Sequence, residues 1–237
     1  MPAGTLYLIP ASLGDSPPSD IWPAGVARRV AELSSFIVEN AKSARAELKR
    51  MGLARPIQEI EIQELPRAPN QADLDALLDP LSAGKSAGLM SEAGAPAVAD
   101  PGAALVRAAH ARGIRVAPLV GPSSLLLALM ASGLNGQNFT FHGYLPSREP
   151  ERGRRIVELE RESRRTGRTQ LFIETPYRNT ALFEALLAGC RAETLLCLAS
   201  ELTTETEHVA TRSIAEWRAG AKPALDKRPT VFLLLAG

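Results

Sequence analysis

MSEAGAPAVADPG, residues 90–102, separates a short apolar run, Ala87–Met90, from a longer helical pattern, Ala103–Arg112. A plain surface turn between a strand and a helix needs only a few turn formers, whereas this segment has two acids, two glycines and two prolines. Small residues after a buried strand let backbone N–H and C=O groups reach a ligand directly. The segment therefore predicts a strand–loop–helix unit whose loop is built for close approach.

The same alternation of strand and helix extends over most of the 237 residues. Expected strands are Thr5–Ile9, Ser35–Val38, Ala87–Met90, Ile114–Pro118, Phe139–His142, Gln170–Glu174, Leu195–Ala199 and Thr230–Leu235, with a half-exposed strand in EIEIQ. Expected helices are Ala72–Leu81, Ala103–Arg112, Ser123–Ser132, Arg152–Arg164, Asn179–Leu187 and Ser213–Arg218. This order predicts an α/β fold with mostly parallel pairing in the first half.

The second half has closely spaced strands near its end, in TLLCLASELTTETEHVATRS, which indicates some antiparallel pairing. Between the halves, Pro118, Gly121 and Pro122 interrupt both the helical and the strand periodicity of the sequence. We therefore expect two α/β domains, residues 1–118 with a mostly parallel sheet and residues 119–237 with a mixed sheet.

Composition narrows the class of protein. Lys and Arg number 27 and Asp and Glu 26, so no global charge attracts nucleic acid, although a local patch still can. No apolar run is long enough to cross a bilayer, and the first residues lack the pattern of a signal peptide. Cys190 and Cys197 are expected to be buried free thiols. We expect a cytoplasmic protein.

The spacing of residues excludes three common kinds of binding motif. Gly84-Lys85-Ser86 precedes a strand, and Asp79 stands where a phosphate loop needs its first glycine. No dinucleotide fingerprint follows a strand. The three histidines have no metal-ligand spacing, so no metal site is predicted.

Three loops of small residues each follow an expected strand: IPASLGD (Ile9–Asp15), Ser91–Asp100, and VGPSS (Val120–Ser124). In an open parallel sheet, ligands bind outside the carboxyl ends of the strands. One such loop alone is more simply a tight turn, but three together favour a cleft for a small molecule.

At these loops the chain resembles the tetrapyrrole methylase superfamily of S-adenosylmethionine-dependent methyltransferases. Its closest likeness is to the branch that 2′-O-methylates a cytidine of small-subunit ribosomal RNA. The likeness rests on an ordered set of segments: LYLIPASLGD, SEAGAPAVADPG, VAPLVGPSSLLLALMASGL, FTFHGYLPSR, LFIETPYRN and LASELTTETE. Glu92 replaces the Asp of that signature, and Val120 replaces a Pro.

Two departures indicate a divergent, short paralogue. After the second strand the branch has Glu-Asp-Thr-Arg, whereas VENAKSAR places Asn40 and Ala41 at the Asp and Thr. The sequence also ends at RPTVFLLLAG, without the C-terminal extension usual in that branch.

The resemblance implies a homodimer of two α/β domains with S-adenosylmethionine in the cleft between them. From the first domain and the junction, the residues expected to bind the donor are Pro10, Ser91, Glu92, Ala93, Gly94, Ala95, Pro96, Val98, Ser123 and Ser124. From the second domain they are Phe172, Ile173, Leu202, Pro229 and Thr230.

A hydroxyl or amide acceptor must also lose a proton during methyl transfer. Glu39, Glu174 and Glu201 lie near expected strand ends, and Glu39 is preferred because it stands where the family has its acid pair. A structural salt bridge between Glu39 and an arginine such as Arg178 is the alternative. Asp100 suits either the donor loop or an N-cap, with Pro101 as first helical residue.

Arg45 and Lys49 lie on one face of a helical stretch with Lys42 and Arg50, and we expect them to contact an RNA substrate. Ribosomal RNA is the expected acceptor. A tetrapyrrole or another small molecule is an alternative acceptor, although Ser91-Glu92-Ala93 disfavours tetrapyrroles, whose enzymes tend to have Gly-Asp-Pro there. A protein that binds the donor without catalysis is the third hypothesis.

Overall fold

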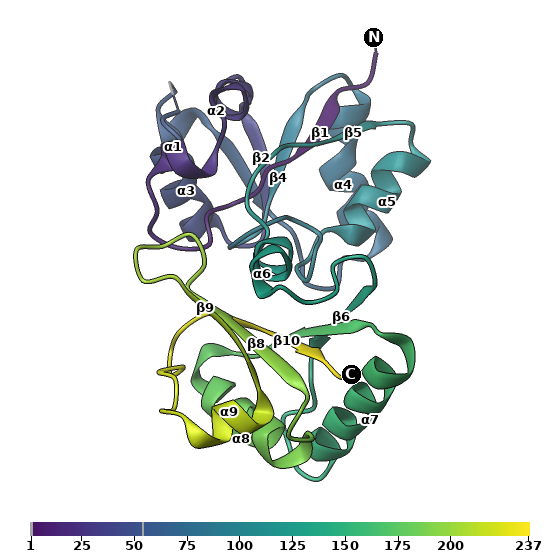
Figure 1. The fold of residues 1–237 in the computed structure, drawn as a ribbon. Coiled ribbons are helices and arrows are strands. Elements are labelled where there is room, and N and C mark those ends of the chain that lie inside the picture. Colours follow the sequence, from purple (N-terminus) through teal and green to yellow (C-terminus); the bar gives the residue numbers. More distant parts are fainter. Residues whose placement is uncertain (1, 54) are drawn as a thin grey trace. The chain divides into compact units, whose positions relative to one another are not determined.

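The computed structural model describes residues 2–53 and 55–237, and it divides the chain into two compact units, which join between Ser123 and Ser124. The sequence placed this division at residues 118 and 119. Each unit has one five-stranded sheet with helices (Figure 1). The predicted α/β fold is confirmed, with an all-parallel first sheet and a mixed second sheet.

The first sheet has the strand order β3-β2-β4-β1-β5. Its strands are β1 (Thr5–Leu8), β2 (Ser35–Val38), β3 (Glu61–Glu64), β4 (Ala87–Met90) and β5 (Arg115–Pro118). The helices described in this unit are α1 (Pro18–Ile21), α2 (Ala24–Ala31), α3 (Ala41–Arg50), α4 (Gln71–Ser82) and α5 (Ala103–Ala111), with a 3-10 turn, η1 (Ile57–Glu59).

Strand periodicity places a hydrophobic core on each face of this sheet. Phe36 and Val38 of β2 pack with α2 and α3, whereas Ile37 between them packs with α4 and α5. Successive strand residues point to opposite faces, so a fully apolar strand such as β2 requires a helical layer on both sides. Figure 1 shows these two layers, α2 and α3 on one side and α4 and α5 on the other.

The second sheet has the strand order β6-β7-β10-β8-β9. Its strands are β6 (Phe139–Tyr144), β7 (Thr169–Ile173), β8 (Leu195–Ser200), β9 (His208–Ser213) and β10 (Thr230–Leu235). The helices are α6 (Ser124–Ser132), α7 (Glu151–Thr166), α8 (Asn179–Gly189) and α9 (Ile214–Ala219), with a 3-10 turn, η2 (Pro176–Arg178).

The core of the second unit joins α7, α8 and α9 to one face of this sheet. Phe172 of β7 stacks on Phe232 of β10 at 5.9 Å between ring centroids, and Phe183 meets Trp217 edge to face. Cys190 and Cys197 are buried and free, as expected. Burial raises the pKa of the Cys190 thiol to about 12, which keeps it protonated and unreactive at neutral pH.

One expectation about a helix start is wrong. α5 begins at Ala103 with Gly102 as its N-cap, and no side chain caps it. Asp100 is therefore not the N-cap and Pro101 is not the first helical residue. Gly102 has φ +134°, a conformation that L side chains rarely adopt, so the chain needs glycine immediately before the helix.

Candidate functional site

The carboxyl ends of β2 and β4 lie at the point of the strand order where an open parallel sheet binds its ligand, and we call this region the crevice. From β2 the chain continues to β3 on one side of the sheet, and from β4 it continues to β5 on the other side. Connections that leave neighbouring strands in opposite directions open a space beyond the strand ends. Glu39 and Ser91 directly follow these two strands.

The structure brings the three small-residue loops of the sequence together at this edge. Ala11 and Gly94 exchange backbone hydrogen bonds of 2.9 and 3.1 Å, which joins the loop after β1 to the loop after β4. Gly121 approaches Pro10 so closely that a Cβ on Gly121 would lie 2.6 Å from the Cβ of Pro10. The loops after β1, β4 and β5 therefore form one continuous backbone surface.

The loop after β4 has an unusual backbone. Gly94 and Gly102 have positive φ, and so do Ala97 at +65° and Ala99 at +66°. A left-handed conformation costs a residue with a Cβ about 1–2 kcal/mol. Such strain persists only where the surroundings enforce it, and it gathers at binding and catalytic sites. This backbone supports a binding role for the segment, beyond that of a simple turn.

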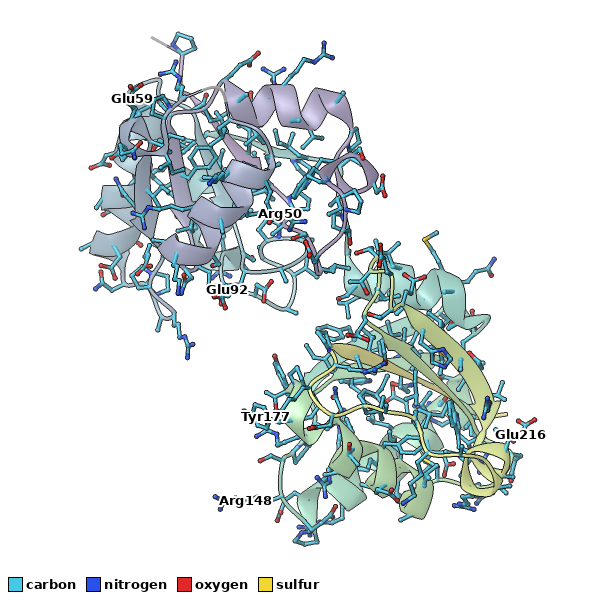
Figure 2. The ribbon with its side chains drawn as sticks, turned by 90° about the vertical axis from the view of Figure 1, so that its left-hand side faces the viewer. Arg50, Glu59, Glu92, Arg148, Tyr177 and Glu216 are labelled. Atoms are coloured by element: carbon cyan, nitrogen blue, oxygen red, sulfur yellow. The ribbon has the colours of Figure 1, made fainter. Side chains whose placement is uncertain are left out.

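Arg50 fixes the loop after β1. Its guanidinium donates to Ser12 Oγ at 2.9 Å and to the carbonyl of Ser16 at 2.6 Å, and it is paired with Glu47 at 3.1 Å. Glu47 is buried and accepts the backbone N–H of Ser12 at 2.5 Å. Figure 2 shows Arg50 within the first unit, and its hydrogen bonds commit it to holding this loop.

Replacement of Arg50 by Ala is expected to lower the free energy of unfolding by about 2–3 kcal/mol, because Glu47 would keep a buried charge without its partner. Arg50→Lys should recover little of this loss, since an ammonium cannot reproduce the fork of donors. Urea unfolding measures both changes. Arg45→Ala, an exposed site on the same helix, is the control and should change stability by less than about 0.5 kcal/mol. Equal losses for Arg45→Ala and Arg50→Ala would contradict the role of Arg50.

Three carboxylates surround the crevice. Glu39 Oε2 accepts the backbone N–H of Glu92 at 3.2 Å, and Ser43 Oγ donates to Glu92 Oε1 at 3.4 Å. Burial, with the nearby charges of Glu39 and Glu92, raises the pKa of Asp100 to about 6, while the Ser91 hydroxyl acts in the opposite direction. Among the described residues, no arginine or lysine forms an ion pair with any of the three. The crevice therefore favours a positively charged ligand.

Ser91 supplies a further polar group. Its side chain is buried, and no hydrogen bond of its Oγ is found among residues 2–53 and 55–237, although the hydroxyl lies near enough to Asp100 to lower the pKa of that carboxyl. A buried hydroxyl without a partner costs about 1–3 kcal/mol, which a ligand atom in the crevice would relieve. Of the other predicted residues here, Pro10, Gly94 and Pro96 are buried, and Glu92, Ala93 and Val98 are exposed.

The predicted donor-binding residues of the second unit gather at one edge of its sheet. β10 is antiparallel to β7 and β8, so its first residue, Thr230, lies beside the carboxyl ends of both. Thr230 Oγ1 and Ser200 Oγ are 2.9 Å apart, and the N–H of Glu201, next to Leu202, donates to the carbonyl of Pro229. Ile173 ends β7 at the same edge.

Phe172 differs from its neighbours at this edge. Its side chain is fully buried in the core of the second unit and stacks on Phe232. The whole residue has no exposed surface, and β7 is paired with β6 and β10 on its two sides, so the burial of Phe172 does not support its predicted contact with the donor. Ser123, directly before α6, and Ser124, its first residue, are partly exposed.

Two of the candidate bases are already paired. The buried Glu174 holds Arg178 at 2.7 Å and also accepts the N–H of Thr175. Glu201 pairs with Arg228 at 3.2 Å. A paired carboxylate is a poor proton acceptor, which leaves Glu39 of the three candidates. The structure adds Asp100, a group that the sequence did not indicate as a base, through its raised pKa. Arg178, the arginine named in the alternative salt bridge of Glu39, pairs with Glu174 of its own unit.

The departure at the end of β2 has a local role. Asn40 is the N-cap of α3, and its side chain accepts the N–H groups of Lys42 and Ser43 at 2.9 and 3.1 Å. Asn and Asp serve equally well as N-caps, so α3 can still begin here although Asn40 stands in place of the Asp of the family motif. Arg45 and Lys49 lie exposed on the same helix.

The sequence model of one protein family, the tetrapyrrole (corrin/porphyrin) methylases, matches residues 26–217. The chain belongs to this family. A ribosomal RNA small subunit methyltransferase I of Xylella fastidiosa is 31% identical over 98% of the chain and 81% of its own length. The Pseudomonas aeruginosa protein of the same name is 29% identical over 100% of the chain and 80% of its own length.

Among solved structures, the methyltransferase CobJ superposes with a TM-score of 0.63 at 19% identity, covering 100% of the chain and 95% of CobJ. At this identity the likeness supports the fold alone. The family and the names of the relatives show that this protein is a methyltransferase. Among the described residues, no helix is long and apolar enough to cross a membrane, and no acidic, histidine or cysteine group has the arrangement of a metal site.

Proposed function

We propose that the protein transfers a methyl group from S-adenosylmethionine to a ribose 2′-hydroxyl of small-subunit ribosomal RNA. The crevice of three converging loops, with unpaired carboxylates and no opposing cation among the described residues, carries this proposal. Relatives that align with nearly the whole chain and are named as ribosomal RNA small subunit methyltransferases support the substrate.

The residues of the crevice fit the proposed donor. When bound, S-adenosylmethionine supplies an electrophilic methyl group on a positively charged sulfur. Glu39, Glu92 and Asp100 provide negative charge for that sulfur, and Ser91 Oγ offers a buried hydrogen-bonding group that lacks a protein partner within the described chain. The glycines of the loops allow segments of the backbone to approach closely, as Gly121 approaches Pro10. The predicted contacts from Phe172, Ile173, Leu202, Pro229 and Thr230 are part of the same proposal.

Positioning is the first contribution of the protein to the rate. Correct alignment of two bound reactants is worth up to about 7–11 kcal/mol of the barrier. The Ala11–Gly94 backbone pair and the Arg50 clamp hold the loops before any ligand arrives. A rigid crevice avoids ordering these segments during the reaction.

Proton removal is the second contribution. We propose Asp100 as the general base, with Glu39, the candidate of the sequence, as the alternative. One oxygen of Glu39 is engaged by the N–H of Glu92, which suits a positioning role. Asp100 is half-buried, and a base with a pKa near 6 accepts a proton more readily than an ordinary aspartate while remaining ionised at neutral pH.

A radiolabel assay tests the proposed function. Ribosomal subunits from cells that lack the protein are incubated with the protein and methyl-labelled donor. We expect label in small-subunit RNA, at a ribose that resists alkaline cleavage. Label only in a tetrapyrrole or another small-molecule fraction would support the second class of acceptor. Donor binding without labelled product in any fraction would support a binding protein without catalysis.

The exposed cations of α3 are proposed to contact the phosphate backbone. Neither Arg45 nor Lys49 has a salt-bridge partner among the described residues; Arg45 only donates to the carbonyl of Ala41. Replacing both by Ala is expected to weaken RNA binding and to reduce the salt slope by about 1.4–1.8, or about 0.7–0.9 for each phosphate that is no longer neutralised. Binding titrations between low and moderate salt measure the slope. An unchanged slope would contradict this contact.

We propose that the protein is a homodimer, as the resemblance implies. Leu126 and Met130 stand one turn apart on α6 and are 55% and 79% exposed, which is unusual for large apolar side chains on an apolar helix. A second copy of the chain would cover them. Light scattering during gel filtration should give twice the monomer mass, and a monomer mass at micromolar concentration would contradict the proposal.

A further inference from the structure

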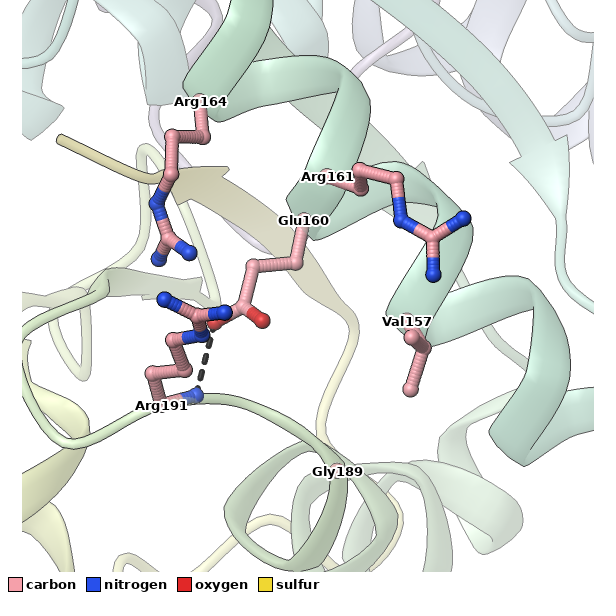
Figure 3. Close-up of a pocket in the computed structure, with 6 residues that line it drawn as sticks. All are labelled: Val157, Glu160, Arg161, Arg164, Gly189 and Arg191. Carbon is pink, nitrogen blue, oxygen red and sulfur yellow. Dashed lines mark hydrogen bonds between the residues drawn. The ribbon is translucent and has the colours of Figure 1, made fainter.

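A cavity of about 360 Å³ lies on the second unit, among residues that the proposed function does not use. The C-terminal half of α7 contributes Val157, Glu160, Arg161 and Arg164, and the end of α8 with its following loop contributes Gly189 and Arg191. Figure 3 shows Arg161 and Val157 on one side and Glu160, Arg164 and Arg191 on the other. Three arginines against one glutamate give the lining a formal charge of 3 − 1 = +2.

The one carboxylate of the lining is committed to the fold. Glu160 is buried, and its Oε1 accepts the backbone N–H of Arg191 at 2.7 Å and the hydroxyl of Thr194 at 2.5 Å. The dashed line in Figure 3 marks the first of these bonds. Glu160 thus holds the loop before β8 in place, and it has no ion pair with the three arginine side chains within the described residues.

The guanidinium groups are less satisfied. Within residues 2–53 and 55–237, the side chains of Arg161 and Arg191 form no hydrogen bond or ion pair. Arg164 donates through Nε to the carbonyl of Gly237, but its Nη2 is buried without a hydrogen-bond acceptor, and Glu193 is 3.9 Å away. By contrast, Arg152, Arg154 and Arg155 of the same region are each paired with a glutamate three residues away.

The floor of the cavity is kept open by a glycine. A Cβ on Gly189 would lie 3.2 Å from Cγ2 of Ile156, so α7 and α8 approach closely here and no side chain fills the space. The cavity therefore combines a fixed apolar floor with donors from two separate elements. Arginine donors without acceptors are suited to a tetrahedral oxyanion, which arginine binds through several N–H groups at once.

We propose that this cavity is a phosphate-binding site, and that the ligand it fits is a backbone phosphate of the RNA. The inference that the phosphate belongs to RNA rests on the proposed function, whereas the inference that the cavity binds a phosphate group does not. A phosphate seated here would supply the acceptor that Arg164 Nη2 lacks and would bridge Arg161 and Arg191. The site would anchor RNA through residues other than the α3 cations of the first unit.

The test compares two double variants with the same change in charge. R161Q/R191Q removes two guanidiniums of the cavity, and R154Q/R165Q removes two exposed guanidiniums elsewhere on α7. Salt-dependent binding of a small-subunit RNA fragment is measured for both and for the wild type. We expect R161Q/R191Q to weaken binding by tenfold or more in low salt and to reduce the salt slope by at least about 0.7, the value for one phosphate on single-stranded RNA. R154Q/R165Q should remain within twofold of wild type.

A second arm uses inorganic phosphate alone, with chloride at matched ionic strength. Phosphate should raise the thermal midpoint of the wild type and of R154Q/R165Q, but not that of R161Q/R191Q. Midpoints without phosphate should agree, since the exchanged side chains are exposed, and this arm excludes misfolding. An effect of phosphate with unchanged RNA binding would overturn RNA as the source and leave a free phosphate as the ligand.

Equal behaviour of the two double variants in both arms would overturn the site itself. Failure of the proposed function is seen separately, as absence of labelled RNA with the wild-type protein. The phosphate arm keeps its meaning in that case, because it needs neither the donor nor RNA.

Discussion

Replacement of Asp100 by Asn is expected to lower the rate of methyl transfer by about 100-fold or more, because a general base contributes about 10²–10⁴ to such a step. An amide has the shape of the carboxylate but cannot accept the proton. Since burial and the charges of Glu39 and Glu92 raise the pKa of Asp100 to about 6, the wild-type rate should rise with pH through about 6. The Asn variant should lose this limb of the profile.

The same substitution should stabilise the protein at neutral pH. The folded-state pKa of Asp100 lies above its ordinary value of 3.8, so the folded protein holds the proton more tightly than the unfolded chain. The contribution of Asp100 to stability therefore falls as pH rises from about 4 to about 6 and stays low above that. Asp100→Asn should gain about 1 kcal/mol at pH 7.5, after allowance for solvent screening of a half-exposed group, and nothing below about pH 4.

A gain in stability with a loss of activity is the signature of a group held at a cost for function. Single-turnover rates and urea unfolding at several pH values measure the two effects. Glu39→Gln should keep the pH limb but move it to lower pH, because the charge of Glu39 helps to raise the pKa of Asp100. The exposed Glu59→Gln is the control for both assays. A wild-type rate and profile for Asp100→Asn, with loss of the limb in Glu39→Gln, would assign the base to Glu39 instead.

Replacement of Gly121 by Ala should weaken donor binding by tenfold or more. The new Cβ would lie 2.6 Å from the Cβ of Pro10 and 2.8 Å from its Cγ, and the proline ring cannot turn away. The loops after β1 and β5 must therefore separate, at a cost of about 1–3 kcal/mol in stability. Isothermal titration with S-adenosylmethionine and urea unfolding measure the two losses.

Gly25→Ala is the matched control for this substitution. A Cβ on Gly25 meets no atom within 4 Å, and Gly25 lies in α2, where Ala is preferred to Gly by up to about 1 kcal/mol. This variant should bind the donor like the wild type and be as stable or more so. Unchanged donor affinity in Gly121→Ala, together with the expected loss of stability, would show that the loop contact serves folding alone.

Local patterns in the sequence predicted much of the fold. Apolar runs such as Ala87–Met90 and Thr230–Leu235 are strands, and the end of the chain pairs antiparallel, as its closely spaced strands indicated. Asn70 begins α4 with a capping box. The short helices α1 and α2 were missed, because Pro17, Pro18 and Pro23 break the periodicity on which a helix prediction depends.

The site was predictable in its loops but not in its electrostatics. Gly94, Gly121 and their small neighbours predict that backbone segments approach one another closely in these loops. By contrast, Arg50 appeared to be one of four surface cations, and only the folded chain shows it clamping Ser12 and Ser16, more than thirty residues away. The raised pKa of Asp100 likewise depends on its burial and then on the charge of Glu39, and a local pattern around Asp100 contains neither.

A crystal structure of the protein with S-adenosylhomocysteine tests the central claim most directly. The account predicts the ligand against the loops after β1, β4 and β5, with Ser91 Oγ in a hydrogen bond to it and the sulfur nearer to the carboxylates of the crevice than to any arginine. A ligand bound elsewhere, with Ser91 still without a partner, would contradict it.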